Sequence, residues 1–127
     1  MLFRSWYHAL LGDHEQALAC CEQAVTLQRE IGNRNDLPST LDSLGLAYHN
    51  LGRHGEAAAS YQRAVDLYCE SGDRFHEADT LIHLGDAYEG AGATGLARTA
   101  WRRALSILDD LRHPAAERLR PRCEVAG

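Results

Sequence analysis

An internal repeat of 40 residues constrains this chain more than any other feature of its sequence. When residues 33–72 are aligned with 73–112, twelve positions are identical, and most of them are small or apolar. In the numbering of the first segment they are Arg34, Thr40, Leu41, Leu44, Gly45, Ala47, Tyr48, Gly52, Gly55, Ala57, Arg63 and Ala64. Residues 1–32 align with 41–72 in the same way, with matches that include Leu11, Gly12, His14, Ala17, Ala24, Val25, Leu27, Glu30 and Gly32. The chain therefore contains three units, the first shortened at its start, and such units fold by stacking on one another.

Each unit has the periodicity of two helices. In the middle unit, apolar residues recur at every third or fourth position, as on one face of a helix. They are Leu41, Leu44, Ala47, Tyr48 and Leu51 in the first half, and Ala57, Ala58, Tyr61, Ala64, Val65 and Tyr68 in the second. Gly52 and Gly72 follow the two halves, as glycine does at helix C-termini, and Asp73 can cap the next helix. No segment alternates with period two, so the pattern predicts an all-α fold with main helices at roughly 1–11, 14–31, 36–51, 54–71, 75–91 and 94–111.

The end of the chain departs from the repeat. We expect one helical domain over 1–120, with units at about 1–32, 33–72 and 73–112 and a partial cap at 113–120. Pro114 suits the first turn of a short helix, and Pro121 is expected to end it. Residues 121–127 are then a disordered tail.

Two glycines lie in the middle of predicted helices, where glycine costs about 1 kcal/mol relative to alanine. Gly45 and Gly85 make sense where a neighbouring helix crosses too closely for a side chain. Ala57 and Ala97 are expected to face them from the second helix of each pair.

The sequence resembles the tetratricopeptide repeat family at its signature positions. In the middle unit these are Leu44-Gly45-x-x-Tyr48, Ala57, Tyr61 and Ala64, and in the third Leu84-Gly85-x-x-Tyr88, Ala97, Trp101 and Ala104. The resemblance covers residues 1–112, although Arg4, Ser5 and His8 replace the Leu-Gly and Tyr of the first unit. It implies a superhelix of antiparallel helix pairs that binds a protein or peptide, without catalysis and without a cofactor.

A narrower resemblance concerns residues 6–13, 78–86 and 101–105, which are similar to the C-terminal repeat arrays of actinobacterial transcriptional regulators with a switch ATPase. It implies that the chain is the interaction and sensing module of a cytoplasmic regulator. A free-standing, self-associating adaptor is the alternative. The chain has no G-x-x-x-x-G-K-[ST] loop and no lysine, so it is not itself the ATPase.

The resemblance also implies a ligand groove, because the first helix of each pair lines the concave surface in this family. The groove-facing positions are Ser39, Asp42, Leu46, His49 and Asn50 in the middle unit, and Asp79, Ile82, His83, Asp86 and Glu89 in the third. Four carboxylates and two apolar side chains favour a partner with basic and apolar groups. The family's clamp for a C-terminal carboxylate uses lysine, arginine and asparagine. Its positions here hold Asp42, Ser43, Leu46, Ile82, His83 and Asp86, which disfavours such a ligand.

Composition excludes several classes of function. A net charge of −5 argues against direct nucleic-acid binding. No apolar run approaches the ~18 residues of a membrane span, and the first residues lack the pattern of a secretory signal, so we expect a cytoplasmic protein. The four cysteines form no C-x-x-C pair, and no two of the seven histidines stand four apart, so we predict no metal site and no disulfides. No nucleophile motif is present, which predicts that the chain is not an enzyme.

The predicted first helix is apolar nearly all round, which is normal only for a helix buried on several sides. We expect its residues to make a self-association contact, as a homodimer or against upstream repeats. The residues concerned are Leu2, Phe3, Trp6, Tyr7 and Leu10. A monomer in which this helix is folded differently is the alternative.

Overall fold

The computed structural model of the chain describes residues 14–32 and 35–124. In these residues the chain forms six α-helices and no strand. They are α2 (His14–Glu30), α3 (Leu37–Asn50), α4 (His54–Ser71), α5 (Arg74–Gly90), α6 (Thr94–Asp110) and α7 (Ala115–Glu124). The predicted all-α fold is confirmed, and the ranges predicted for α2 to α6 agree to within one residue at each end. The predicted helix 1–11 lies outside the described residues.

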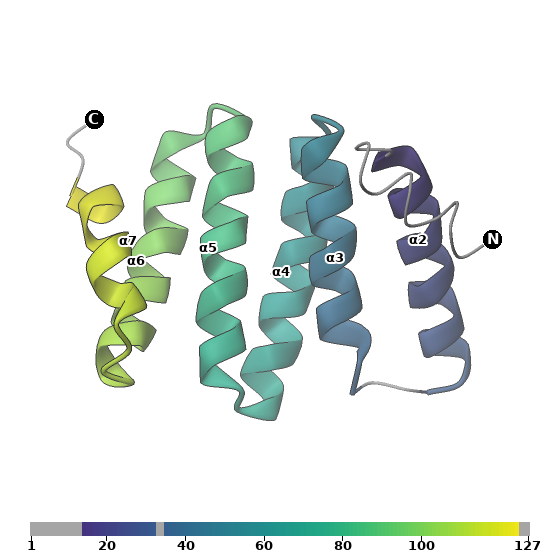
Figure 1. Cartoon of the computed structure of the whole chain (residues 1–127), viewed down its shortest axis with the longest axis horizontal. Helices are drawn as coiled ribbons and strands as arrows, with labels where there is room; N and C mark the ends of the chain where they lie inside the picture. Colours follow the sequence, from purple (N-terminus) through teal and green to yellow (C-terminus); the bar gives the residue numbers. More distant parts are fainter. Residues whose placement is uncertain (1–13, 33–34, 125–127) are drawn as a thin grey trace.

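The helices stand in a row of antiparallel neighbours (Figure 1). Each described helix packs on the one before it and the one after it, and α3 also contacts α5 directly. In Figure 1, α3 and α5 lie in front of α4, which fills the space behind them. This places the exposed sides of α3 and α5 next to each other, although they belong to different units of the repeat.

The links between helices share one backbone conformation. Positive φ angles occur at Gly32, Gly52, Gly72, Gly92 and Arg112, at intervals of 20 residues. Each helix plus its link therefore takes half of the 40-residue unit. Glycine adopts this left-handed conformation without steric cost, whereas a residue with a Cβ pays about 1 kcal/mol. Arg112 is the exception, and its φ is 53°.

The core follows the repeated positions. Leu41 and Leu81 are fully buried, and the repeat alanines Ala57, Ala64 and Ala104 are also 0% exposed. The buried residues form two clusters, one over α2–α4 and the other over α4–α7. The leucines and alanines that are identical between units are thus buried where helix packs on helix.

Alanines were expected opposite the mid-helix glycines, but the side chain nearest to each of them is an aromatic ring. A Cβ added at Gly45 would lie 2.6 Å from Cε1 of Tyr61, and one added at Gly85 would lie 2.8 Å from Cε2 of Trp101. Each glycine therefore makes room for a large aromatic ring of the second helix. The ring of Trp101 is held there by a hydrogen bond of 3.2 Å that its Nε1 donates to the carbonyl of Ile82.

The C-terminal expectation was wrong in part, because α7 continues through Pro121 to Glu124. A proline inside a helix removes one hydrogen bond and costs about 3 kcal/mol. Here Leu119 and Cys123 are both buried against the preceding helices, and fully burying a side chain such as leucine returns about 1.5–3 kcal/mol. Tertiary packing therefore keeps residues 121–124 in the helix rather than in a disordered tail.

Candidate binding face on α3 and α5

The ten predicted groove residues all lie on α3 or α5, and we refer to them together as the α3/α5 face. None of them is buried. Ser39, Leu46, Asn50 and Glu89 are exposed, while Asp42, His49, Asp79, Ile82, His83 and Asp86 are half-buried. The reason is the helical period, because the repeated apolar stripe of each helix turns toward the core and leaves these residues on the opposite side. That they bind a ligand remains a prediction.

His83 is the centre of this face. Its Nδ1 lies 2.9 Å from Oδ1 of Asp42, so the pair joins α5 to α3. The hydrogen bond that His83 donates to Asp42 raises the pKa of His83, burial opposes this, and the negative charges of Asp42, Asp79 and Asp86 raise it further. Asp42 thus contacts His83 directly, and the charges of Asp42, Asp79 and Asp86 together favour its protonated form.

The floor beneath His83 is aromatic. The ring of Tyr61 from α4 lies 5.6 Å from the ring of His83, centroid to centroid. Tyr61 is only 2% exposed, and burial followed by the charges of Asp42 and Asp86 raises the pKa of its hydroxyl. Tyr61 thus stays neutral, so it packs beneath His83 without adding charge to the face.

A basic side chain from α7 reaches the same face. Nη1 of Arg122 lies 3.0 Å from Oδ1 of Asp86, and the guanidinium stands 5.5 Å from the centroid of the Trp101 ring. Beside it, Glu89 and Arg98 line a hollow of about 200 Å³ together with Arg122 and Trp101. Sequence analysis missed Arg122 because it assigned this residue to the disordered tail.

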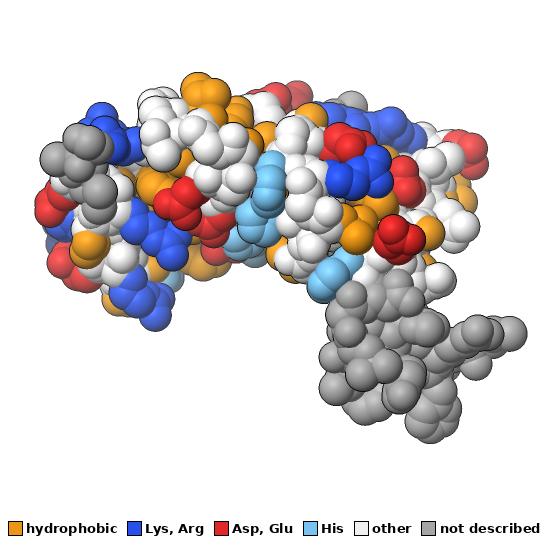
Figure 2. Space-filling model, turned by 90° about the horizontal axis from the view of Figure 1, so that it is seen from above, with side chains coloured by type: hydrophobic (Ala, Val, Ile, Leu, Met, Phe, Trp, Pro, Cys, Tyr) orange, Lys and Arg blue, Asp and Glu red, His pale blue; other side chains and the backbone are white. Residues whose placement is uncertain are grey.

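A second histidine contact was also missed. The Nδ1 atoms of His49 and His54 lie 3.1 Å apart, so one ring must donate a hydrogen bond and the other accept it. His54 packs against Gly90, where an added Cβ would come within 2.7 Å of its ring. The five-residue spacing of these histidines across Gly52 was visible in the sequence, but a link that folds back on itself was needed to bring them together. Seen from above, histidine side chains lie near the middle of the row of helices, with acidic and arginine side chains to either side (Figure 2).

The remaining features concern metal-binding groups, cysteines and membrane-spanning helices in the part of the chain that the structure describes. No group of three or more His, Cys, Asp and Glu side chains there is arranged to hold a metal ion. The four cysteines are free thiols, and Cys123 is buried. None of the described helices is both long and apolar enough to span a membrane. The predicted self-association residues Leu2, Phe3, Trp6, Tyr7 and Leu10 lie outside the described residues.

Stacked antiparallel helix pairs, glycines under aromatic rings and a polar face on successive first helices define a helical repeat scaffold. Comparison with family models is more specific, because the tetratricopeptide repeat model matches residues 6–70 and again 39–110. The chain belongs to the tetratricopeptide repeat family. No protein with a curated description was found to match it. Repeats of this family generally mediate protein–protein interaction and are typically non-catalytic scaffolds.

Proposed function

We propose that this chain is the protein-binding module of a cytoplasmic transcriptional regulator, and that its α3/α5 face binds a basic segment of the partner. The observation that supports this most is the contact between Asp42 and His83, together with the charges of Asp79 and Asp86, which also raise the pKa of His83. Exposed Leu46 and half-buried Ile82 on the same face offer apolar contact. Complementary charge would mainly guide association and set specificity. The regulator assignment draws on the similarity of residues 6–13, 78–86 and 101–105.

The carboxylates of the face differ in how available they are. Asp42 is paired with His83, and Asp86 is paired with Arg122. Asp79 and Glu89 make no ion pair with any residue in the described ranges, so they are the ones that meet an incoming cation first. A partner arginine near Asp86 must either displace Arg122 or sit beside it.

Titration of the chain with a blocked synthetic peptide of alternating arginine and leucine tests the proposal. Calorimetry measures the binding at low and at high salt. The double variant Asp79→Asn/Glu89→Gln should bind it about 10-fold more weakly, because it loses two charge-assisted contacts. It should also show a smaller dependence on salt. Glu70→Gln is the matched control, since Glu70 is an exposed carboxylate on α4. Equal weakening in the control, or equal binding of a peptide with glutamine for arginine, would contradict the proposal.

The alternative is a free-standing adaptor that associates with itself. Two large apolar side chains near the end of α2 favour a contact at this end of the array, since Leu27 is 56% exposed and Ile31 is 64% exposed. A homodimer through the predicted first helix would cover this end, and so would a contact with upstream repeats. The full-length gene separates the two, because a regulator encodes an ATPase before the repeats and an adaptor does not.

A further inference from the structure

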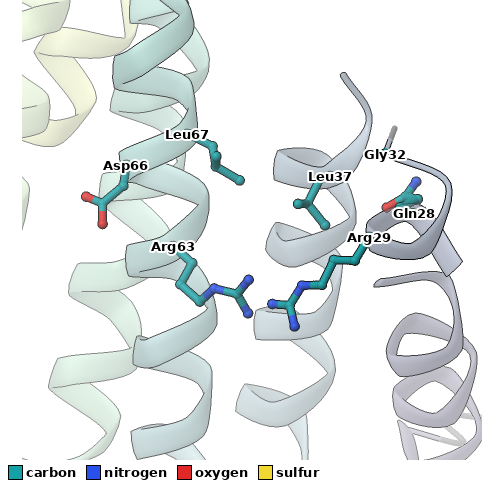
Figure 3. Close-up of a pocket in the computed structure, with 7 residues that line it drawn as sticks. All are labelled: Gln28, Arg29, Gly32, Leu37, Arg63, Asp66 and Leu67. Atoms are coloured by element: carbon teal, nitrogen blue, oxygen red, sulfur yellow. The ribbon is translucent and has the colours of Figure 1, made fainter. Parts of the chain in front are cut away.

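A hollow on the side of α2 and α4 contains two arginines that point toward each other. It measures about 540 Å³ and lies between α2 and α4, over the first residue of α3. Figure 3 shows the guanidinium groups of Arg29 from α2 and Arg63 from α4 converging in it. Its other lining residues are Gln28, Gly32, Leu37, Asp66 and Leu67. A hollow of this size is in the range of ligand pockets in proteins.

The two cations in this hollow have no negative partner among the described residues. Neither Arg29 nor Arg63 forms an ion pair there, although the whole chain carries a net charge of −5. The carboxylate among the lining residues is that of Asp66, but its Oδ1 accepts a hydrogen bond of 3.0 Å from Gln62, and Figure 3 shows it turned away from the guanidiniums. Two like charges brought together without a counter-charge are unfavourable, and an anion between them would reverse the sign of the interaction.

The helix dipole explains the position of only one of these two arginines. Arg29 is in the last turn of α2, where a cation interacts favourably with the helix dipole. Arg63 is in the middle of α4 and has no such reason. The repeat supplies a comparison, because the residues 40 positions further on are Cys69 and Arg103. Arg103 on α6 thus corresponds to Arg63, but Cys69 on α4 stands in place of Arg29. The convergent arginine pair therefore does not recur between α4 and α6.

A third group in the hollow lacks a hydrogen-bond partner. The Oε1 atom of Gln28 is buried and accepts no hydrogen bond from the described residues. A buried acceptor of this kind is costly when unsatisfied, but it has almost no accessible surface and so does not itself face an incoming ligand. Leu37 and Leu67 offer apolar surface in the same place. The hollow thus presents two cations beside the apolar side chains of Leu37 and Leu67, and the buried acceptor of Gln28 is among its lining residues.

We propose that this hollow binds an acidic segment of a protein partner. One carboxylate of that segment bridges Arg29 and Arg63, and a neighbouring apolar side chain of the same segment packs on Leu37 and Leu67. The site is independent of the α3/α5 face, which has the opposite charge. The chain would then hold two partners, or two parts of one partner, through faces of opposite sign.

The test is a heteronuclear NMR titration with a blocked peptide that carries two glutamates beside one leucine. Saturable shifts are expected for Leu37 and Leu67. The double variant Arg29→Gln/Arg63→Gln should bind the peptide at least about 10-fold more weakly, since charge-assisted hydrogen bonds are lost. Both arginines are exposed, so the variant should fold like the parent. Arg103→Gln is the matched control and should change the affinity by less than about twofold, since exposed groups of this kind contribute little on their own.

Three results would overturn the proposal. The first is equal weakening by Arg103→Gln, and the second is equal binding of the peptide with glutamine for glutamate. The third is that inorganic phosphate reproduces the same shifts at the same concentration, which would make this a site for small anions and not for a peptide. The arginine–leucine peptide should still shift the signals of α5 in the Arg29→Gln/Arg63→Gln variant. Failure of the proposal for this hollow is therefore distinguishable from failure of the proposal for the α3/α5 face.

Discussion

The substitution Gly85→Ala tests how the repeat glycines work. In an open helix this change would stabilise by about 1 kcal/mol, because alanine has the higher helix propensity. At position 85 the added methyl group would stand 2.8 Å from Cε2 of Trp101 and closer still to its Nε1. Trp101 is 6% exposed and is tied to the Ile82 carbonyl, so the ring cannot move away without losing that hydrogen bond. Overpacking costs about 1–3 kcal/mol and the lost bond about 1 kcal/mol, so we expect a net destabilisation of about 1–3 kcal/mol.

Urea unfolding followed by circular dichroism measures this difference, provided that the slope with denaturant is unchanged. Gly95→Ala is the control, because Gly95 is helical and an added Cβ there meets nothing within 4 Å. It should leave stability unchanged or raise it by up to about 1 kcal/mol. The penalty of Gly85→Ala should also shrink in a Trp101→Leu background, because the ring that it strikes is gone. If Gly85→Ala proved as stable as the parent, the aromatic ring over the glycine would not be the reason for glycine at this position.

Other predictions concern single features. Arg112→Gly should stabilise the chain by about 0.5–1 kcal/mol because φ is positive there, whereas Arg112→Ala should not; urea midpoints compare them, and equal midpoints would exclude backbone strain. The folded-state pKa of His83 is raised, so the stability that its pairing with Asp42 contributes is fully present below pH 6.5. This stability is lost as the pH rises through the folded-state pKa. Asp42→Asn should therefore lower the pKa of His83 in an NMR titration, and an unshifted titration would refute the pairing. We also expect a homodimer, or an oligomer whose size depends on concentration, with Trp6 in the contact. Light scattering at micromolar concentration checks this, and a clean monomer would show it wrong.

The sequence was sufficient to predict helices α2 to α6 and the faces by which they pack. Leu41 and Leu81 repeat at the same position and are both fully buried, and Gly72 and Asp73 form the helix link that their residue types predict. These features depend on the helical period and on local backbone preferences, which act over a few residues. The family resemblance indicated ten residues of α3 and α5, and none of them is buried in the structure, but that they bind a ligand stays a prediction.

Only the tertiary structure decided which of these side chains meet. Asp42 and His83 are 41 residues apart and do not occupy equivalent positions in the two units, so the repeat gives no reason to pair them. Arg122 reaches Asp86 only because α7 packs on α6 and continues past a proline that should have ended it. Arg29 and Arg63 converge because α2 and α4 stand on either side of the start of α3. The repeat pattern determines how each helix packs on its neighbour, since that packing uses the apolar stripe. Contacts between polar side chains of different units depend on the rotation and offset of whole helices, which arise from the packing of every large and small residue between them.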